Sequence, residues 1–243
     1  MRMNTDGIVL RVTDTGESDR AVTVLTRDFG VIHAFANGAK KVKSRFLGAT
    51  QPLCFSRFSI YKSRNSYIID EAQSIEVFFG LREDIETLAL AQYFCELAGE
   101  LAPELDDADE YLRLLLNSLH MLVSGKRSQN QIKAVFEMRI LTLAGYMPDL
   151  SVCPHCGDEP ESEIYFSVDD GCIYCAQSAH RGVSITAGVL SAMRHICICP
   201  DKRIFAFEMP PASLSLLSEI SEKYLVAQTQ RRYKSLDFYK SLF

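Results

Sequence analysis

Residues 153–175 begin with Cys153-Pro154-His155-Cys156-Gly157 and end with Cys172-Ile173-Tyr174-Cys175. Each cysteine pair encloses two residues, and fifteen residues separate the two pairs. Two enclosed residues form a tight turn that directs both sulfurs inward, and the whole spacing is typical of a structural zinc site. The sequence therefore predicts that Cys153, Cys156, Cys172 and Cys175 hold one Zn²⁺ as a tetrahedron, about 2.3 Å from each sulfur.

A closed shell of four thiolates leaves no position for water, so the predicted metal would hold structure and perform no chemistry. Residues 164–168, between the pairs, have strand character and would form the hairpin that brings the pairs together. The competing interpretation is four unrelated thiols, either buried or redox-active. His155 and His180 are further candidates for the metal site, whereas Cys197 and Cys199 are too closely spaced to chelate and are interpreted as buried.

The composition indicates a globular protein of the cytoplasm. Hydrophobic residues make up 47% of the 243 residues, enough for two or three compact units. No run of about twenty apolar residues is present to span a membrane, and the first residues lack a secretion signal. A chain of this length does not need a disulfide framework, so metal-bound thiols in a reducing compartment explain the eight cysteines better.

The formal charge of −5 conceals an uneven distribution along the chain. Residues 1–80 carry 11 basic and 8 acidic side chains, residues 81–180 carry 6 and 18, and residues 181–243 carry 9 and 5. An acidic middle between two basic ends favours a polyanionic partner that contacts the ends.

The first third of the chain reads as β structure. Five runs have strand-like patterns of β-branched and aromatic residues: 7–13, 21–27, 31–37, 53–62 and 66–73. Five short strands with one longer connection after the third fit a small barrel such as an OB-fold, with an SH3-like barrel as the alternative.

That longer connection, residues 38–48, holds four cations and no anion: Lys40, Lys41, Lys43 and Arg45. Such a segment would bind nucleic-acid phosphates in a salt-sensitive way. Four aromatic residues lie close to it and would offer stacking faces for bases: Phe46, Phe55, Phe58 and Tyr61. The bland alternative is that the aromatic residues are core and that the lysines solvate a loop.

From residue 81 the hydrophobic period becomes helical. We expect helices over residues 81–101, 109–123, 131–144, 186–197 and 212–228, with the acidic residues 104–110 as a solvated loop and a basic tail at Arg231, Arg232 and Lys234. The prediction is thus an α+β protein: an N-terminal OB-fold barrel (1–80), an α-helical domain (81–152 and 181–243) and an embedded four-cysteine zinc module (153–180). No catalytic set is recognisable, and we expect a protein that is not an enzyme.

The order of these parts resembles the RecO family of recombination mediators. Three segments carry the resemblance: Gly16–Arg20 with Thr23–Thr26 and Gly30; Gly38–Lys40 through Arg45 with Gly48 and Gln51–Leu53; and Phe136–Leu141 with Gly145–Leu150 before Cys153. Together these matches span nearly the whole chain.

The resemblance implies a DNA repair and recombination mediator that binds single- and double-stranded DNA and anneals complementary strands. It would act with RecR to load RecA on strands coated by the single-stranded DNA-binding protein SSB, and it would lie in the cytoplasm with the nucleoid. By this resemblance the DNA-contacting residues are Lys40, Lys41, Lys43, Arg45 and Arg20, followed by Arg231, Arg232 and Lys234. A groove near Lys133 or Arg139 would receive the SSB tail. The alternative from another class is a zinc-ribbon transcription or translation factor that binds RNA.

Overall fold

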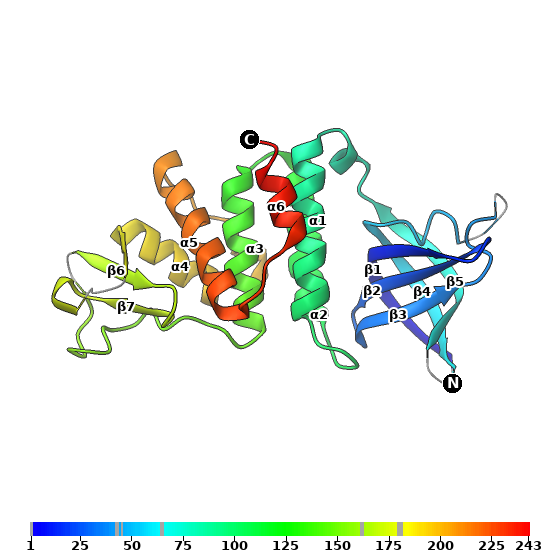
Figure 1. The fold of residues 1–243 in the computed structure, drawn as a ribbon, viewed down its shortest axis with the longest axis horizontal. Helices are drawn as coiled ribbons and strands as arrows, with labels where there is room; N and C mark the ends of the chain where they lie inside the picture. The colour runs from blue at the N-terminus through cyan, green and yellow to red at the C-terminus, as the bar shows by residue number, and fades with distance from the viewer. Residues whose placement is uncertain (1, 42–43, 45, 64–65, 161–162, 179–181) are drawn as a thin grey trace. The chain divides into compact units, whose positions relative to one another are not determined.

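The computed structural model describes residues 2–41, 44, 46–63, 66–160, 163–178 and 182–243 (Figure 1). The chain divides into two compact units, Met1–Val123 with Ser235–Phe243, and Ser124–Lys234. The predicted mixed α+β class is confirmed, with a sheet in the N-terminal part and helices beyond it. The four predicted domains, with boundaries at residues 80, 152 and 180, stay a prediction.

In the first unit, five strands close into a barrel in the order β1-β2-β3-β5-β4. The strands are β1 (Arg2–Thr15), β2 (Asp19–Thr26), β3 (Gly30–Ala36), β4 (Cys54–Lys62) and β5 (Tyr67–Val77). Each of the five predicted runs corresponds to one strand. Neighbouring strands are antiparallel except β3 and β5, which are parallel.

Side-chain alternation fills the inside of the barrel with apolar residues. Inward positions on β2 and β3 include Val22, Val24, Ile32 and Ala34, all almost fully buried. Residues between them point outward, which leaves the outer surface to be covered by other elements or exposed.

Helices complete the first unit: a 3₁₀ turn (Phe79–Arg82), α1 (Ile85–Leu101), α2 (Asp109–Ser124) and the short C-terminal α6 (Lys234–Lys240). Asp84 caps α1 because its carboxylate accepts a hydrogen bond from the Thr87 backbone N–H at 2.8 Å. α6, where the sequence predicted a basic tail and no further helix, is held to α1 by Glu96, whose carboxylate accepts a hydrogen bond from the Ser235 backbone N–H at 3.1 Å.

The connection between α1 and α2 is a loop whose acidic side chains are solvated, as predicted, but its backbone is not free. Its backbone pairs with the β2–β3 hairpin: Val31 N–H donates to the Pro103 carbonyl at 2.9 Å, and Leu105 N–H donates to the Phe29 carbonyl at 3.1 Å. A Cβ on Gly30 would lie 1.9 Å from the Pro103 oxygen, so only glycine permits this approach. A run of charged residues predicts that the side chains are solvated. It does not predict which backbone groups the segment pairs with, so this pairing was missed.

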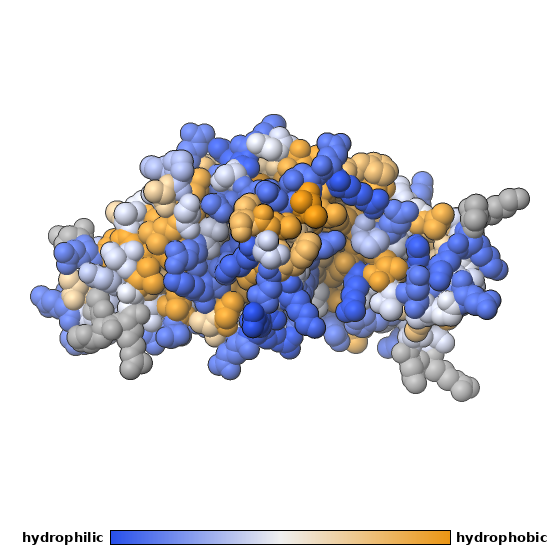
Figure 2. Space-filling view, turned by 45° about the horizontal axis from the view of Figure 1, so that its top comes forward, coloured by the Kyte–Doolittle hydropathy of each residue, from blue (hydrophilic) through white to orange (hydrophobic). Residues whose placement is uncertain are grey.

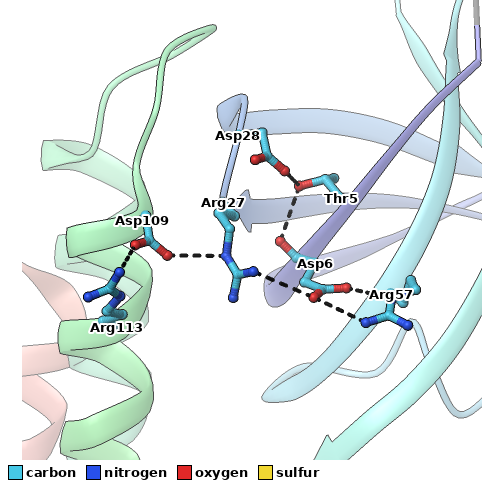
Figure 3. A network of polar contacts seen from close by, with 7 residues as sticks. All are labelled: Thr5, Asp6, Arg27, Asp28, Arg57, Asp109 and Arg113. Atoms are coloured by element: carbon cyan, nitrogen blue, oxygen red, sulfur yellow. Dashed lines mark hydrogen bonds and ion pairs between the residues drawn. The ribbon is translucent and has the colours of Figure 1, made fainter.

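Charged side chains reinforce this junction between the barrel and α2 (Figure 3). Asp6 accepts from Arg57 at 2.9 Å and lies 3.9 Å from Arg27, and Arg27 reaches Asp109 at 3.1 Å. Asp109 also pairs with Arg113 on the next turn of α2. Arg27 and Arg57 thus share the Asp6 carboxylate, and both side chains stay exposed.

The second unit contains three helices and a three-stranded sheet. The helices are α3 (Gln129–Leu143), α4 (Ala187–Ile198) and α5 (Pro211–Thr229), and the sheet order is β7-β6-β8. Its strands are β6 (Ile164–Ser167), β7 (Cys172–Tyr174) and β8 (Val183–Ile185). The predicted hairpin between the cysteine pairs is confirmed as β6 and β7. Thr186 caps α4, because its side chain accepts a hydrogen bond from the Val189 backbone N–H at 3.2 Å.

The surface mixes hydrophilic and hydrophobic residues. In the face shown in Figure 2, hydrophilic side chains cover much of the area and separate smaller hydrophobic areas. Among the described residues, no helix combines the length and the apolar character needed to cross a membrane.

Candidate nucleic-acid interface and metal centre

One part of the outer barrel surface is left open on strands β1, β2 and β3. Two cross-strand rows of outward side chains define it. The first row is Arg11, Thr23 and His33, and the second is Thr13, Ala21 and Phe35. We call these six residues the open face.

β2, the middle strand of the open face, contributes the small side chains of Ala21 and Thr23. A shallow hollow of about 370 Å³ therefore lies between the side chains of β1 and β3. Arg11, His33 and Phe35 are exposed at its sides, and the His33 ring nitrogen lies 3.1 Å from the Thr23 hydroxyl. A cation, Arg11, and an aromatic ring, Phe35, beside a hollow are parts from which nucleic-acid sites are built. Sequence reasoning did not select these three residues, although alternation along 31–36 marks His33 and Phe35 as outward if the strand's inner face is known.

Two of the predicted phosphate contacts come together at one end of the barrel. Arg20, at the start of β2, and Lys40, beyond β3, approach the same carboxylate, that of Asp14, at 3.5 Å and 3.3 Å. The backbone supports this meeting because Lys40 N–H donates to the Ser18 carbonyl at 2.9 Å. Lys41 is exposed. Lys43 and Arg45 lie outside the described residues.

The predicted stacking aromatics divide into two groups. Phe46 and Phe58 are buried in the barrel core, 9% and 1% exposed, so their interpretation as base platforms was wrong. Tyr61 is 38% exposed and remains available, and Phe55 is half-buried. The strand pattern explains the outcome, because Phe58 shares the inward parity of Ile60 whereas Tyr61 has the opposite parity.

The C-terminal cations lie between α5 and α6. Gln230 ends α5 in a left-handed conformation, and the side chains of Arg231, Arg232 and Lys234 that follow are exposed. Their assignment to DNA stays a prediction.

Lys133 and Arg139, predicted to receive an acidic tail, are both engaged inside the second unit. Lys133 is 3% exposed, and its Nζ lies 2.9 Å from both Glu137 and Glu222. Arg139 donates to the Cys197 carbonyl at 2.6 Å and pairs with Asp201 at 3.2 Å. Neither cation is presented to a partner, so the prediction was wrong. It failed because helix periodicity alone could not tell the buried side of α3 from its exposed side.

Three of the four predicted zinc ligands come together. The sulfur atoms of Cys153, Cys156 and Cys175 all lie within 4.8 Å of one another, and the Cys175 sulfur is 3.9 Å from each of the other two. Two ligands about 2.3 Å from a tetrahedral Zn²⁺ lie about 3.8 Å apart, so the three thiols fit the ion. The Cys172 thiol instead donates to the Asp170 carbonyl at 3.4 Å.

The thiols differ in their readiness to ionise. Burial acts to raise the pKa of Cys153, but hydrogen bonds from the backbone N–H groups of Cys175, Cys156 and His155 lower it to about 6. Burial, together with Asp149 and Asp170, raises the pKa of Cys172. Metal ligation requires thiolates, and the lowered pKa of Cys153 favours its thiolate, whereas the raised pKa of Cys172 disfavours it until a cation is near. His155 is exposed, and His180 lies outside the described residues. Cys197 and Cys199 are buried, as predicted.

A small closed barrel, a helical region and a thiol cluster with metal-ligand spacing together define a class of modular α+β proteins. Family models described as the N terminal and the C terminal of recombination protein O match residues 1–78 and 82–237. The chain therefore belongs to the RecO family, as its sequence motifs suggested.

Similar proteins cover the chain almost from end to end. The RecO protein of Acetivibrio thermocellus is 34% identical over 99% of this chain and 97% of its own length. Those of Symbiobacterium thermophilum and Myxococcus xanthus are each 32% identical over 98% of this chain, and the matches cover 97% and 96% of the relatives. Each of the three is described as a DNA repair protein.

Proposed function

We propose that this protein is a DNA repair protein that binds DNA through its barrel. Family membership supports the repair role, and the open face with the cations beside it supports DNA as the ligand. The observation that carries the proposal is the convergence of Arg20 and Lys40 from different segments at the barrel end that borders the hollow. Such a protein would lie with the nucleoid in the cytoplasm.

The barrel is, in this proposal, an OB-fold. Five strands closed in the order β1-β2-β3-β5-β4 support this assignment. OB-folds bind oligonucleotides on the face of strands 2 and 3 and with the loops that flank it. The open face uses those two strands together with β1, and Arg20 follows the loop between β1 and β2.

The proposed activity is annealing of complementary strands, with RecR as a partner in loading RecA on SSB-coated DNA. Base pairing is itself favourable, so annealing requires only that the repulsion between two polyanions be lowered and the strands be held close. The cations of the barrel and those at Arg231, Arg232 and Lys234 would supply this effect. No nucleotide hydrolysis is needed, which agrees with the proposal that the protein is not an enzyme.

Zinc, in the same proposal, joins the hairpin of β6 and β7 to the knuckle at residues 153–157. Cys153, Cys156 and Cys175 would hold it, with Cys172 as the fourth ligand after its thiol leaves the Asp170 carbonyl. A four-thiolate site binds the metal without an open position and so stabilises the fold.

The test is annealing of two complementary DNA strands coated with the cognate SSB, without ATP, compared with complementary RNA strands. Wild type should anneal the DNA, and a variant with Arg20→Ala, Lys40→Ala and Lys41→Ala should anneal it at least about tenfold more slowly. A variant with Lys126→Ala, Lys202→Ala and Arg203→Ala, which removes three exposed cations from the second unit, is the matched control. Absence of DNA annealing by the folded wild type, or activity on RNA alone, would overturn the proposal.

A further inference from the structure

We propose that Phe35, Ile68 and Tyr61 form a base-stacking track on the barrel, which binds single-stranded DNA in preference to duplex. The inference rests on the proposed function and adds the form of DNA that this surface selects. Nothing in the family match specifies such a track.

The three residues belong to one continuous row across neighbouring strands. Phe35 on β3 is opposite Ile68 on β5, and Ile68 is opposite Tyr61 on β4. All three have outward parity, because their neighbours Ala34, Ile69 and Ile60 are in the barrel core. Adjacent strands lie about 4.8 Å apart, so the backbone positions of Phe35 and Tyr61 are about 10 Å apart, with Ile68 between them.

The rings are accessible where other aromatic residues of the strands are not. Phe35 is 39% exposed and Tyr61 is 38% exposed. Phe58 is buried, and Tyr67 packs against the core. Two accessible rings in one row offer a ligand two apolar faces on the same surface.

Charged side chains lie on both sides of the track, and the three residues of the track itself carry no charge. Continuing the row past Phe35 leads to Ala21 and Thr13 in the open face, and past Tyr61 it leads to Arg2, none of which is acidic. Arg2 pairs with Asp70, and Lys62 lies over the Tyr67 ring at 6.0 Å. Arg11 flanks the other end. Asp70 offsets the charge of Arg2, so Lys62 and Arg11 are the cations on the two sides of the apolar residues. Cations beside apolar faces match a strand whose phosphates and bases are both available.

This chemistry separates single strands from duplex. In a duplex the base faces are stacked on one another and inaccessible, so it would contact only the cations, whereas a single strand would gain stacking as well. Stacking does not depend on the base, and the track would therefore be tolerant of sequence.

The experiment compares three ligands of equal length: a single-stranded oligonucleotide, the same strand with abasic sites, and its duplex. The variant is Phe35→Leu with Tyr61→Leu, which keeps apolar side chains and removes both rings. Phe35→Tyr with Tyr61→Phe keeps the rings and should bind as wild type does. Phe238→Leu, at an exposed phenylalanine of α6, is the control. Thermal unfolding checks that each variant is folded.

Wild type should bind the base-bearing strand at least about tenfold more tightly than the abasic strand, and the leucine variant should lose that difference. Its affinity for duplex and the salt dependence of its binding should be unchanged, because no charge is removed. If the leucine variant binds the single strand as tightly as wild type, or loses affinity equally for all three ligands, the stacking track is wrong. The proposal that the barrel binds DNA would still stand. If folded wild type binds none of the three, the proposed function itself fails.

Discussion

At the scale of single residues, a buried charge holds α3 to α5. Burial acts to lower the pKa of Lys133, but Glu137 and Glu222 outweigh it and the pKa is raised. Glu137 is fully buried and also accepts a hydrogen bond from the Ser221 hydroxyl. Removing the cation would leave buried carboxylates without their partner, which costs more than the intact group contributes.

We therefore predict that Lys133→Met lowers the free energy of unfolding by about 3–5 kcal/mol, measured in urea. Lys223→Met is the control, because Lys223 pairs with Glu219 at an exposed position of α5 and should cost at most about 0.5 kcal/mol. Because the pKa of Lys133 is raised in the folded protein, its contribution persists through neutral pH and is lost only as the pH rises through that raised value. Equal effects of the two substitutions would contradict this assignment.

Gly30 offers a second test at residue scale. Gly30→Ala places a Cβ against the Pro103 carbonyl and should cost well over the 1–2 kcal/mol of left-handed strain alone. Gly16→Ala is a control with a similar positive φ, where a Cβ meets no described atom within 4 Å. The difference in unfolding free energy between the two variants isolates the close approach, and a difference near zero would rule it out.

At the scale of elements, periodicity predicted most of the fold. The five strands, the helices near residues 85–101, 109–124, 129–143, 187–198 and 211–229, and the hairpin within the cysteine module were all expected. Such patterns report which residues are buried locally. They cannot report what a segment pairs with at long range, so the backbone pairing of residues 103–108 with the barrel, the strand β8 and the helix α6 were missed.

The cysteine module gives the prediction at this scale. Cys153→Ala and Cys175→Ala should abolish stoichiometric zinc and lower the unfolding temperature, since metal binding is coupled to folding. Cys172→Ala should also lose zinc if the fourth ligand is its thiol. Cys95→Ala, at a buried thiol of α1 in the other unit, should keep the metal content of wild type. Zinc-free wild type with unchanged unfolding would refute the structural role.

At the scale of the whole molecule, charge along the sequence pointed to the barrel as the DNA-binding part, which stays a proposal, but it did not separate exposed side chains from buried or paired ones. The basic segment 38–48 drew attention to the barrel, and its Lys40 does approach the same Asp14 carboxylate as Arg20. Charge counting could not show which carboxylates the cations pair with, such as Asp6 for Arg57 and Asp14 for Arg20 and Lys40, or that Phe58 is core while Phe35 is exposed. Those distinctions depend on strand parity and on contacts between residues far apart in the chain.

The measurement to make first is the salt dependence of single-stranded DNA binding for wild type and for a variant with Arg11→Ala, Lys40→Ala and Lys41→Ala. Each phosphate contact to a single strand contributes about 0.7 to the logarithmic slope, so removing three should reduce it by about 2. The control with Lys126→Ala, Lys202→Ala and Arg203→Ala should keep the wild-type slope. If the salt slope falls in the control and stays at the wild-type value in the barrel variant, the barrel is not the DNA-binding surface.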